Sequence, residues 1–499
     1  MSRGLATALQ RIVKGSGLVL AGALVALVLN FFSKLILARG FSVSDYGVFN
    51  LAIAVLSFLG LLVALGLPEG VAREVSYYRV KDPGRVESIV SMSFFLALVA
   101  GVVGGVSLFF TSGVLAGFLR VPMLSFALRA LSFALPFQAL LTLVVSVARG
   151  FGRVREKIFF QDIGVSLFWL LGLLFVYFVS LPFCYVFVAY VAAYALSLAA
   201  LLAYERSRGL LSLGLVFDPG LAARLLSFSL PLLFTGVMGF VMNWTDTLML
   251  GYLRGPRVVG VYNAAAPLAR LLTVPIGVAG FMFLPVVSEL YARGEMSELR
   301  RVYQVVAKWL FLVSLPLFAA YVLFPGLVVS VVFGARYIGG SVALVVLSLG
   351  FIFHVLMGLN GMSLVALGET RLIALYNLVA ALLNVVLNAL LIPVYGIVGA
   401  AAATAASYIL GNTLSTLRLY KEYRVQPFYA SYVKTLGIAF LLLIALKALS
   451  MRAPGWLGAG LYISLYMIFF LLLLVVTRSI DREDVELLRV LRGVLAQKF

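Results

Sequence analysis

Long apolar segments recur along the whole chain and dominate what it can fold into. An α-helix rises about 1.5 Å per residue, so about 20 consecutive apolar residues cross the hydrocarbon core of a bilayer. The residues are 63% hydrophobic and only 11% charged, a balance that a soluble domain cannot bury. We therefore predict an all-α polytopic membrane protein of about 14 transmembrane helices, over residues 16–37, 47–67, 89–110, 123–147, 158–179, 183–203, 225–250, 258–284, 307–333, 341–366, 373–392, 396–417, 433–450 and 456–477.

Two parts of the chain resemble each other at a nearly constant spacing. The hexapeptide at 47–52 (GVFNLA) returns in the second part at 260–265 (GVYNAA). At the same spacing Asn30 falls on Asn243, and at a slightly longer spacing the segment 152–161 falls on 368–377. Each copy holds six predicted helices, an even number, so both copies start on the same side of the membrane as parallel repeats do. Duplicated halves with a site between them are typical of transporters rather than enzymes.

The repeat divides the chain into two pseudo-symmetric six-helix lobes and an appendage. The segment 68–88 is polar enough to leave the membrane as a short amphipathic helix on its inner face, and 288–304 is its expected equivalent. We predict an N-lobe with helices 1–6 over residues 1–210 and a C-lobe with helices 7–12 over residues 211–418. Residues 419–499 are expected to hold helices 13 and 14 and a cytoplasmic amphipathic tail.

The formal net charge of +19 reflects membrane topology rather than nucleic-acid binding. Most of the 38 Lys and Arg residues fall in loops on one side of the predicted helices, which the positive-inside rule assigns to the cytoplasm. We therefore expect a plasma-membrane protein with both termini cytoplasmic and a first helix that is retained rather than cleaved. Anionic membrane lipids are expected partners of the basic loops, and nucleic acid is not.

The sequence carries no motif for enzyme chemistry. A GxxxxGK[ST] phosphate loop is absent, and one His with one Cys cannot build a zinc cluster or a Cys/His dyad. Asp481 and Asp484 flank Arg482 in the tail, where we interpret them as a solvated helix face rather than a metal site. We expect no enzyme, metal or cofactor. Energy, if required, would come from a coupling ion (H+ or Na+), the membrane potential or substrate supply.

Ionisable side chains within predicted spans are functional hypotheses, because each costs about 2.5–3.5 kcal/mol near the bilayer centre. Arg270 lies roughly 18 Å below the outer end of its span, too deep to reach the surface easily. Asn263, Pro267 and Arg270 share one helical stripe that Gly260 and Gly277 continue. A polar stripe marked by Gly and Pro favours a helix that lines a wet cavity. Pairing of Arg270 with a neighbouring helix is the structural alternative.

A second group of polar residues lies near the outer ends of helices 1 and 7. Asn30 and Lys34 stand close together on the first, and Asn243 heads a stripe with Asp246 on the second. Lys34 is interpreted either as a cavity cation or as a side chain that snorkels to the surface. A Lys34–Asp246 or Arg270–Asp246 pair could close an outer gate. Static charge neutralisation would explain the same residues.

The remaining intramembrane candidates are Arg129 and His354, together with several amides. Snorkelling is the alternative to a cavity role for Arg129. His354 is the only residue of a type that titrates near neutral pH, so a hydrogen-bonded core histidine and a proton-coupling residue are both open. On helix 11, Asn377, Asn384 and Asn388 form one polar face, which favours hydrogen bonds between helices.

Cations outnumber acids among these candidates, so we predict a cavity that favours an anionic substrate. Phosphate esters of a lipid carrier would fit, and amide side chains suit sugar hydroxyls. The predicted site comprises the substrate-binding cations Arg270, Lys34 and Arg129, the polar side chains Asn30, Asn50, Asn243 and Asn263, and Asp246 and His354 for gating or ion coupling.

Two stretches of sequence resemble a known family. Residues 31–69 (FFSKLILARGFSVSDYGVFNLAIAVLSFLGLLVALGLPE) resemble the opening helices of the polysaccharide-transporter branch of the multidrug/oligosaccharidyl-lipid/polysaccharide exporter superfamily. Residues 367–399 (LGETRLIALYNLVAALLNVVLNALLIPVYGIVG) resemble the signature of its helices 10–12. The resemblance implies a flippase that moves a prenyl-linked oligosaccharide between leaflets by alternating access, for cell-surface polysaccharide or glycoprotein assembly. It implies cationic cavity residues for the phosphates, and Lys34, Arg129 and Arg270 are the residues available here for that role.

Two other functions compete with this interpretation. An ion-coupled multidrug or organic-cation antiporter of the same fold would need more acid than base in its cavity, and only Asp246 supports it. An integral membrane glycan polymerase or ligase would need long outer loops with carboxylates or a His/Arg cluster, and the predicted outer loops are short. The charge pattern therefore favours the flippase.

Overall fold

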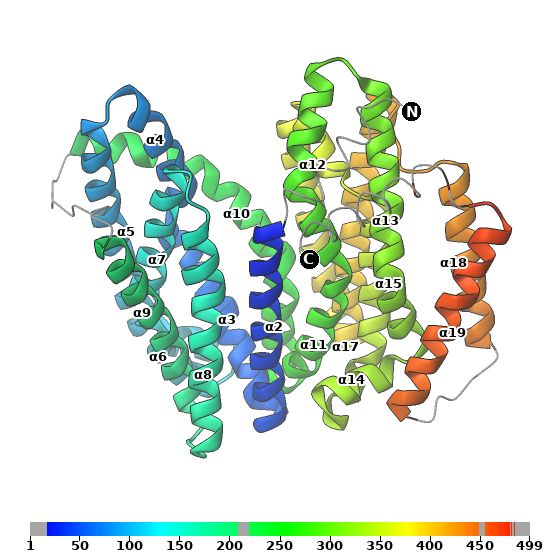
Figure 1. Ribbon diagram of the computed structural model, residues 1–499. Helices are drawn as coiled ribbons and strands as arrows, with labels where there is room; N and C mark the ends of the chain where they lie inside the picture. The colour runs from blue at the N-terminus through cyan, green and yellow to red at the C-terminus, as the bar shows by residue number, and fades with distance from the viewer. Residues whose placement is uncertain (1–16, 208–218, 449–454, 480, 482–483, 485–499) are drawn as a thin grey trace. The chain divides into compact units, whose positions relative to one another are not determined.

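The computed structural model describes residues 17–207, 219–448, 455–479, 481 and 484 (Figure 1). The regular elements of these residues are all helices, which confirms the predicted all-α class. Eleven helices are long and apolar enough to cross a membrane, and the number reaches 13 when each of two bent helix pairs is taken as one span. The chain is a multi-pass membrane protein, and the predicted count of fourteen is not confirmed.

The described residues form two compact units. We call Ala21–Gly260 the N-unit, and Val261–Phe499 with Met1–Leu20 the C-unit. The division falls later in the chain than the predicted lobe boundary at residue 210, because α10 (Pro219–Arg254) packs against α3, α4 and α5 of the N-unit. The lobes of the repeat and the appendage over residues 419–499 stay predictions.

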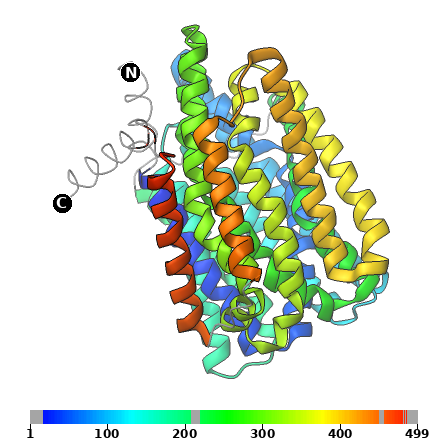
Figure 2. The same ribbon diagram turned by 90° about the vertical axis from the view of Figure 1, so that its right-hand side faces the viewer.

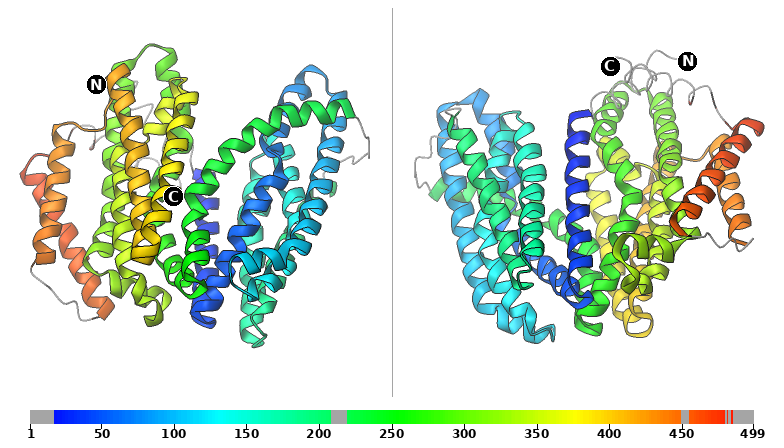
Figure 3. Two further views of the ribbon diagram at one scale, coloured as in Figure 1. Left: turned by 180° about the vertical axis from the view of Figure 1, so that it is seen from behind. Right: turned by 60° about the horizontal axis from the view of Figure 1, so that its bottom comes forward.

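The N-unit is a bundle of helices in which α5 and α7 pack closely. A Cβ on Gly101 would lie 2.8 Å from the Cα of Pro136, so this glycine lets the two helices approach. The helix α10 bends by 51° between Pro219–Pro231 and Gly236–Arg254 (Figure 3). The elements of the unit before α10 are α2 (Gly17–Gly40), α3 (Val43–Ala64), α4 (Leu67–Lys81), α5 (Gly84–Phe118), α6 (Met123–Ser132), α7 (Ala134–Gly150), the π-helix η1 (Lys157–Gly164), α8 (Val165–Phe178) and α9 (Cys184–Ser207).

The C-unit begins within α11, and its regular elements are helices throughout the part of it that the structure describes. Its last two helices, α18 and α19, pack on each other and on α13 (Figure 2). The long α17 contains both predicted segments 373–392 and 396–417, separated by the non-helical Gly396. The elements are α11 (Pro256–Arg270), η2 (Leu271–Thr273), α12 (Val274–Ala292), α13 (Met296–Leu323), α14 (Pro325–Phe333), η3 (Ala335–Gly340), α15 (Ser341–Met357), α16 (Asn360–Ala366), α17 (Thr370–Tyr423), α18 (Ala430–Ala448) and α19 (Gly455–Val476).

The two repeat glycines face each other's helices, and both belong to the N-unit. A Cβ on Gly47 would lie 1.7 Å from the carbonyl oxygen of Pro256. A Cβ on Gly260 would lie 2.2 Å from the carbonyl oxygen of Val43. Real Cβ atoms cannot approach a backbone this closely, so the first turns of α3 and α11 pack backbone to backbone only because both residues are glycine. The duplicated motif is therefore a packing element of the scaffold.

The helix α4 confirms a short helix over most of the predicted segment 68–88, but it ends at Lys81, and residues 84–88 begin α5. The α3–α4 junction has left-handed backbone at Leu65 and at Gly66, and a Cβ on Gly66 would lie 2.0 Å from the carbonyl oxygen of Ser229 on α10. The expected equivalent at 288–304 was wrong as a separate element. This segment comprises the end of α12, a turn with Gly294 at φ +72°, and the start of α13. Whereas Leu65 and Gly66 interrupt the chain before α4, no left-handed residue interrupts α12 before its end at Ala292.

Candidate functional site

The helix that carries Arg270 is broken close to that residue. The helix α11 ends at Arg270, a 3-10 turn runs over Leu271–Thr273, and α12 begins at Val274. Pro275 explains the break, because a proline has no N–H to donate and its ring clashes with the carbonyl four residues earlier, that of Leu271. Arg270 is half-buried, and Asn263, about two helical turns before it, is buried. Irregular helix at a polar residue is typical of a functional hinge.

Side chains of α13 hold the broken helix from one side. Tyr321 Oη donates a hydrogen bond to the carbonyl of Leu268 over 2.8 Å, and Ser314 Oγ donates to the carbonyl of Leu272 over 3.0 Å. Residue 270 stands about 200° around the helix from residue 268, so Arg270 lies on the face away from α13. The break is therefore preformed, with its backbone satisfied on the buried side and its cation on the other.

His354 belongs to a hydrogen-bonded network that joins α15, α16 and α17. Asn412 Nδ2 donates to the carbonyl of Tyr408 over 2.7 Å, so Asn412 Oδ1 faces His354 Nδ1 at 2.8 Å and Asn360 Nδ2 at 3.1 Å. An amide oxygen only accepts, so the network assigns the proton to His354 Nδ1. Thr416 Oγ1 accepts a further bond from Asn360 Nδ2 over 3.1 Å. His354 is thus hydrogen-bonded in the core of the C-unit, and its role in ion coupling stays a prediction.

The three amides of the predicted span 373–392, which lie on α17, agree in part with the interpretation that they form hydrogen bonds between helices. Asn384 Nδ2 donates to Thr404 Oγ1 over 3.3 Å, which joins the two halves of α17 across Gly396. Asn388 Nδ2 donates to Asn384 Oδ1 within the same half over 3.0 Å. Asn377 is exposed.

The polar candidates of the N-unit lie on α2, α3 and α10. Asn30 Nδ2 donates to Ser166 Oγ of α8 over 2.8 Å. Asn50 and Asn243 each donate to the carbonyl one turn earlier on their own helix, both over 2.7 Å. Lys34 is half-buried, and Asp246 on α10 is only 1% exposed. The Lys34–Asp246 gate stays a prediction.

Arg129 is exposed and lies against α5. Its Nε donates to Ser112 Oγ over 3.2 Å, and its guanidinium stands 5.9 Å from the centre of the Phe109 ring. These contacts are of the kind that the snorkelling alternative predicts, with the aliphatic stem over apolar surface. A cavity role for Arg129 stays a prediction.

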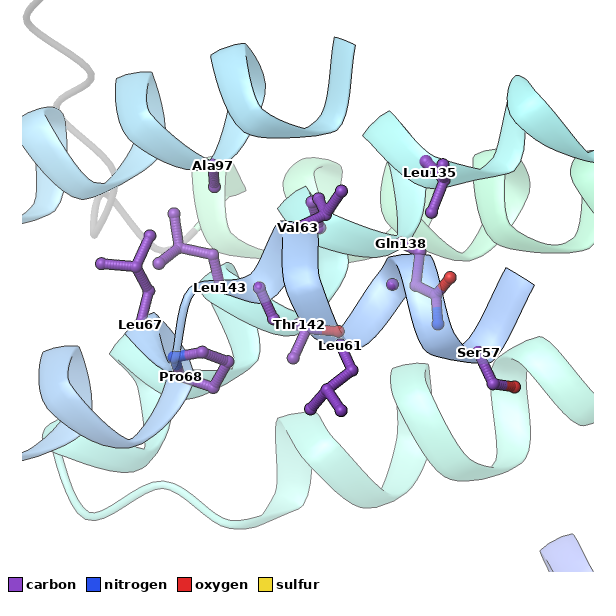
Figure 4. Close-up of a pocket in the computed structure, with 13 residues that line it drawn as sticks. Ser57, Leu61, Val63, Leu67, Pro68, Ala97, Leu135, Gln138, Thr142 and Leu143 are labelled. Atoms are coloured by element: carbon purple, nitrogen blue, oxygen red, sulfur yellow. The ribbon is translucent and has the colours of Figure 1, made fainter. Parts of the chain in front are cut away.

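A pocket of about 260 Å³ lies inside the N-unit and was not predicted from the sequence. It is bounded by the second half of α3, the start of α4, α5 and α7 (Figure 4). Its polar lining includes Ser57, Gln138 and Thr142. Ser57 precedes Arg270 by the spacing that relates Asn30 to Asn243, and Gln138 precedes His354 by the spacing that relates 152–161 to 368–377. The spacing of the repeat, applied to His354, would have indicated Gln138 from the sequence.

A buried charge cluster in the C-unit corrects our interpretation of the tail. Lys308 of α13 is 1% exposed, and its Nζ bonds Asp484 Oδ2 at 2.5 Å and Asp481 Oδ2 at 3.2 Å. Asp484 is 3% exposed, so it does not belong to a solvated helix face. The prediction was wrong because local sequence does not show a partner 176 residues away. The rest of the predicted tail helix lies outside the described residues.

The fold is that of solved membrane transporters. The structure named "Lipid II flippase MurJ, inward closed conformation" aligns with a TM-score of 0.73 at 14% sequence identity, over 90% of this chain and 97% of that one. Identity this low concerns the fold alone. The sequence profile of the family described as "Polysaccharide biosynthesis protein" matches residues 12–291, and that of the MatE family matches 231–390. The chain belongs to the polysaccharide biosynthesis protein family, within the multidrug/oligosaccharidyl-lipid/polysaccharide exporter superfamily.

Curated relatives agree with this assignment. A protein of Shigella flexneri named "Putative O-antigen transporter" is 25% identical over 81% of this chain and 96% of its own length. A protein of Haloferax volcanii named "Probable low-salt glycan biosynthesis flippase Agl15" is 26% identical over 39% of this chain, and the match spans 41% of that relative. The printed names of these two relatives describe a transporter and a flippase.

Proposed function

We propose that this protein is a flippase that moves a prenyl-phosphate- or prenyl-diphosphate-linked oligosaccharide across the plasma membrane. The family and the flippase relatives support a lipid-linked glycan as the substrate class. Transport would proceed by alternating access between the two lobes of the repeat, with both termini in the cytoplasm. Asp246 and His354 are the residues that a coupling ion (H+ or Na+) would use.

The observation that carries the proposal is the position of Arg270 at a proline break within a predicted span. A guanidinium pairs with phosphate oxygens through two parallel hydrogen bonds, which suits a diphosphate carrier. The 3-10 turn after Arg270 lies between Pro267 and Pro275, and α13 satisfies the carbonyls on the opposite face. Arg270 is thereby presented on the polar stripe with Asn263. Lys308 does not add to this cationic site, since two carboxylates neutralise it.

The test is leaflet-resolved transport of a fluorescent prenyl-diphosphate oligosaccharide in proteoliposomes. Loss of a charge-assisted hydrogen bond costs about 1.5–3 kcal/mol, so Arg270→Ala should slow flipping about 10- to 100-fold. Arg257→Ala is the matched control, because Arg257 is exposed on the same helix. Flipping by Arg270→Ala at the control rate would refute the cationic site. Export of a cationic dye without glycolipid flipping would assign the protein to the antiporters instead.

A further inference from the structure

The pocket of the N-unit has the size of a small site. Its volume of about 260 Å³ lies below the roughly 300–1,000 Å³ of pockets for drug-sized ligands. It would hold a fragment of about one ring. In Figure 4 the side chains of Gln138 and Ser57 lie at one end of the pocket, and Leu67 and Leu143 lie at the other.

The chemistry of the lining suits a neutral guest that donates hydrogen bonds. None of the 13 described residues that line the pocket is charged. The Oε1 atom of Gln138 is buried and accepts no hydrogen bond from the described residues. A buried acceptor without a partner costs about 1–3 kcal/mol. A hydroxyl group of a guest would remove that cost, and aliphatic side chains such as Leu61 and Val63 would cover its apolar face.

The local packing leaves room for the Gln138 amide against α3. A Cβ on Gly60 would lie 3.2 Å from Gln138 Oε1, tighter than an ordinary contact. Thr142 Oγ1 accepts from Gln161 Nε2 over 3.4 Å, a bond that uses an oxygen lone pair and leaves the hydroxyl hydrogen to donate elsewhere. The pocket thus offers both an acceptor and a donor, which a polyol can satisfy together.

The repeat gives the pocket its place in the transporter. Its polar positions Ser57 and Gln138 correspond to Arg270 and His354 of the C-unit. We infer that the N-unit pocket binds a neutral polyol fragment through Gln138 and Thr142, whereas in the C-unit the repeat positions of Ser57 and Gln138 carry the cation and the imidazole. The polyol is a sugar residue of the glycan or the glycerol of a lipid headgroup. Where the polyol is a sugar residue of the glycan, the inference rests on the proposed function.

The test uses Gln138→Leu, with Gln304→Leu of α13 as the matched control. Removing an acceptor that has no partner relieves its desolvation cost, so Gln138→Leu should be at least as stable to thermal unfolding in detergent as the wild type. With the sugar as the guest, it should in proteoliposomes flip a prenyl diphosphate that carries one N-acetylhexosamine about tenfold more slowly, the loss expected for one hydrogen bond to a buried acceptor. Bare prenyl diphosphate should move at an unchanged rate.

Hydrogen exchange of residues 57–64 and 135–143 distinguishes the two sources of polyol. Protection by the glycosylated carrier but not by bare prenyl diphosphate supports the sugar. Protection by phosphatidylglycerol but not by phosphatidic acid, lost in Gln138→Leu, supports the lipid glycerol. Equal slowing of both carriers by Gln138→Leu, or protection that is independent of Gln138, would overturn the inference. Flipping of neither carrier by the wild type would contradict the proposed function, and the exchange data would still decide the pocket.

Discussion

Replacing Lys308 by methionine should be among the most damaging single changes in the C-unit. The ammonium of Lys308 also donates to the carbonyl of Ser479 over 2.8 Å and lies 3.3 Å from Ser431 Oγ. Asp484 Oδ1 accepts from Trp309 Nε1 over 2.9 Å, so the whole cluster is hydrogen-bonded. Methionine keeps the apolar stem and removes the charge. The buried Asp484 and the half-buried Asp481 would then lose the ammonium that they share.

The expected cost follows from the burial of both ions. Breaking a buried pair by removal of one partner costs about 3–5 kcal/mol, and Lys308 and Asp484 are 1% and 3% exposed. Lys434→Met on α18 is the matched control, because Lys434 is exposed and should cost less than about 0.5 kcal/mol. The assay is chemical denaturation in detergent, with hydrogen exchange of α18 as a local readout.

A double-mutant cycle separates the pair from its surroundings. Asp484→Asn alone should also destabilise, and the Lys308→Met and Asp484→Asn changes together should cost less than the sum of the two, by about 1–3 kcal/mol. Equal free energies of unfolding for the Lys308→Met and Lys434→Met variants would refute the role of the buried ion pair. Additive costs would show that Lys308 acts through Asp481 and Ser431 instead.

Two further predictions concern packing and pH. Gly47→Ala places a Cβ 1.7 Å from the carbonyl oxygen of Pro256 and should destabilise by at least about 1–3 kcal/mol, whereas Gly113→Ala, with open space around it, should be neutral or stabilising in the same denaturation assay. The bond from Arg418 at 2.7 Å, and then the one from Tyr423 at 3.2 Å, lower the pKa of Glu369. A lowered carboxyl pKa stabilises the fold above the unfolded value of about 4.3, and this contribution is lost as the pH falls through the folded value. The thermal stability of Glu369→Gln should therefore fall less than that of the wild type between about pH 5 and pH 3.

The helices could be predicted from the sequence because their main determinant is local. A span requires only a run of apolar residues, and the interruptions are marked by residues whose backbone limits are known, such as Pro275 and Gly396. The short helix α4 was visible because its polarity departs from its neighbours. The equivalent at 288–304 failed because polarity shows where a helix leaves the bilayer but not where it stops.

The candidate site could be predicted only where burial in the membrane makes a residue unusual by itself. Arg270 and Asp246 stand out because ionised groups are costly in a span. Gln138 does not stand out, since a neutral amide in an apolar segment is common and only its missing partner makes it informative. Lys308 does not stand out either, because it is the second residue of the predicted span 307–333 and a lysine at the end of a span looks solvated until its partners are known.

The repeat separates scaffold from function in a way that single residues do not. Gly47 and Gly260 are the same in both copies, and each is needed for a backbone contact that no other residue allows. Asn50 donates a hydrogen bond to the carbonyl one turn earlier on its own helix, which an asparagine at other helical positions could also do. Ser57 and Arg270 differ, as do Gln138 and His354, although their places in the repeat are equivalent. We therefore propose these two pairs as the positions at which the halves are specialised for different parts of one substrate.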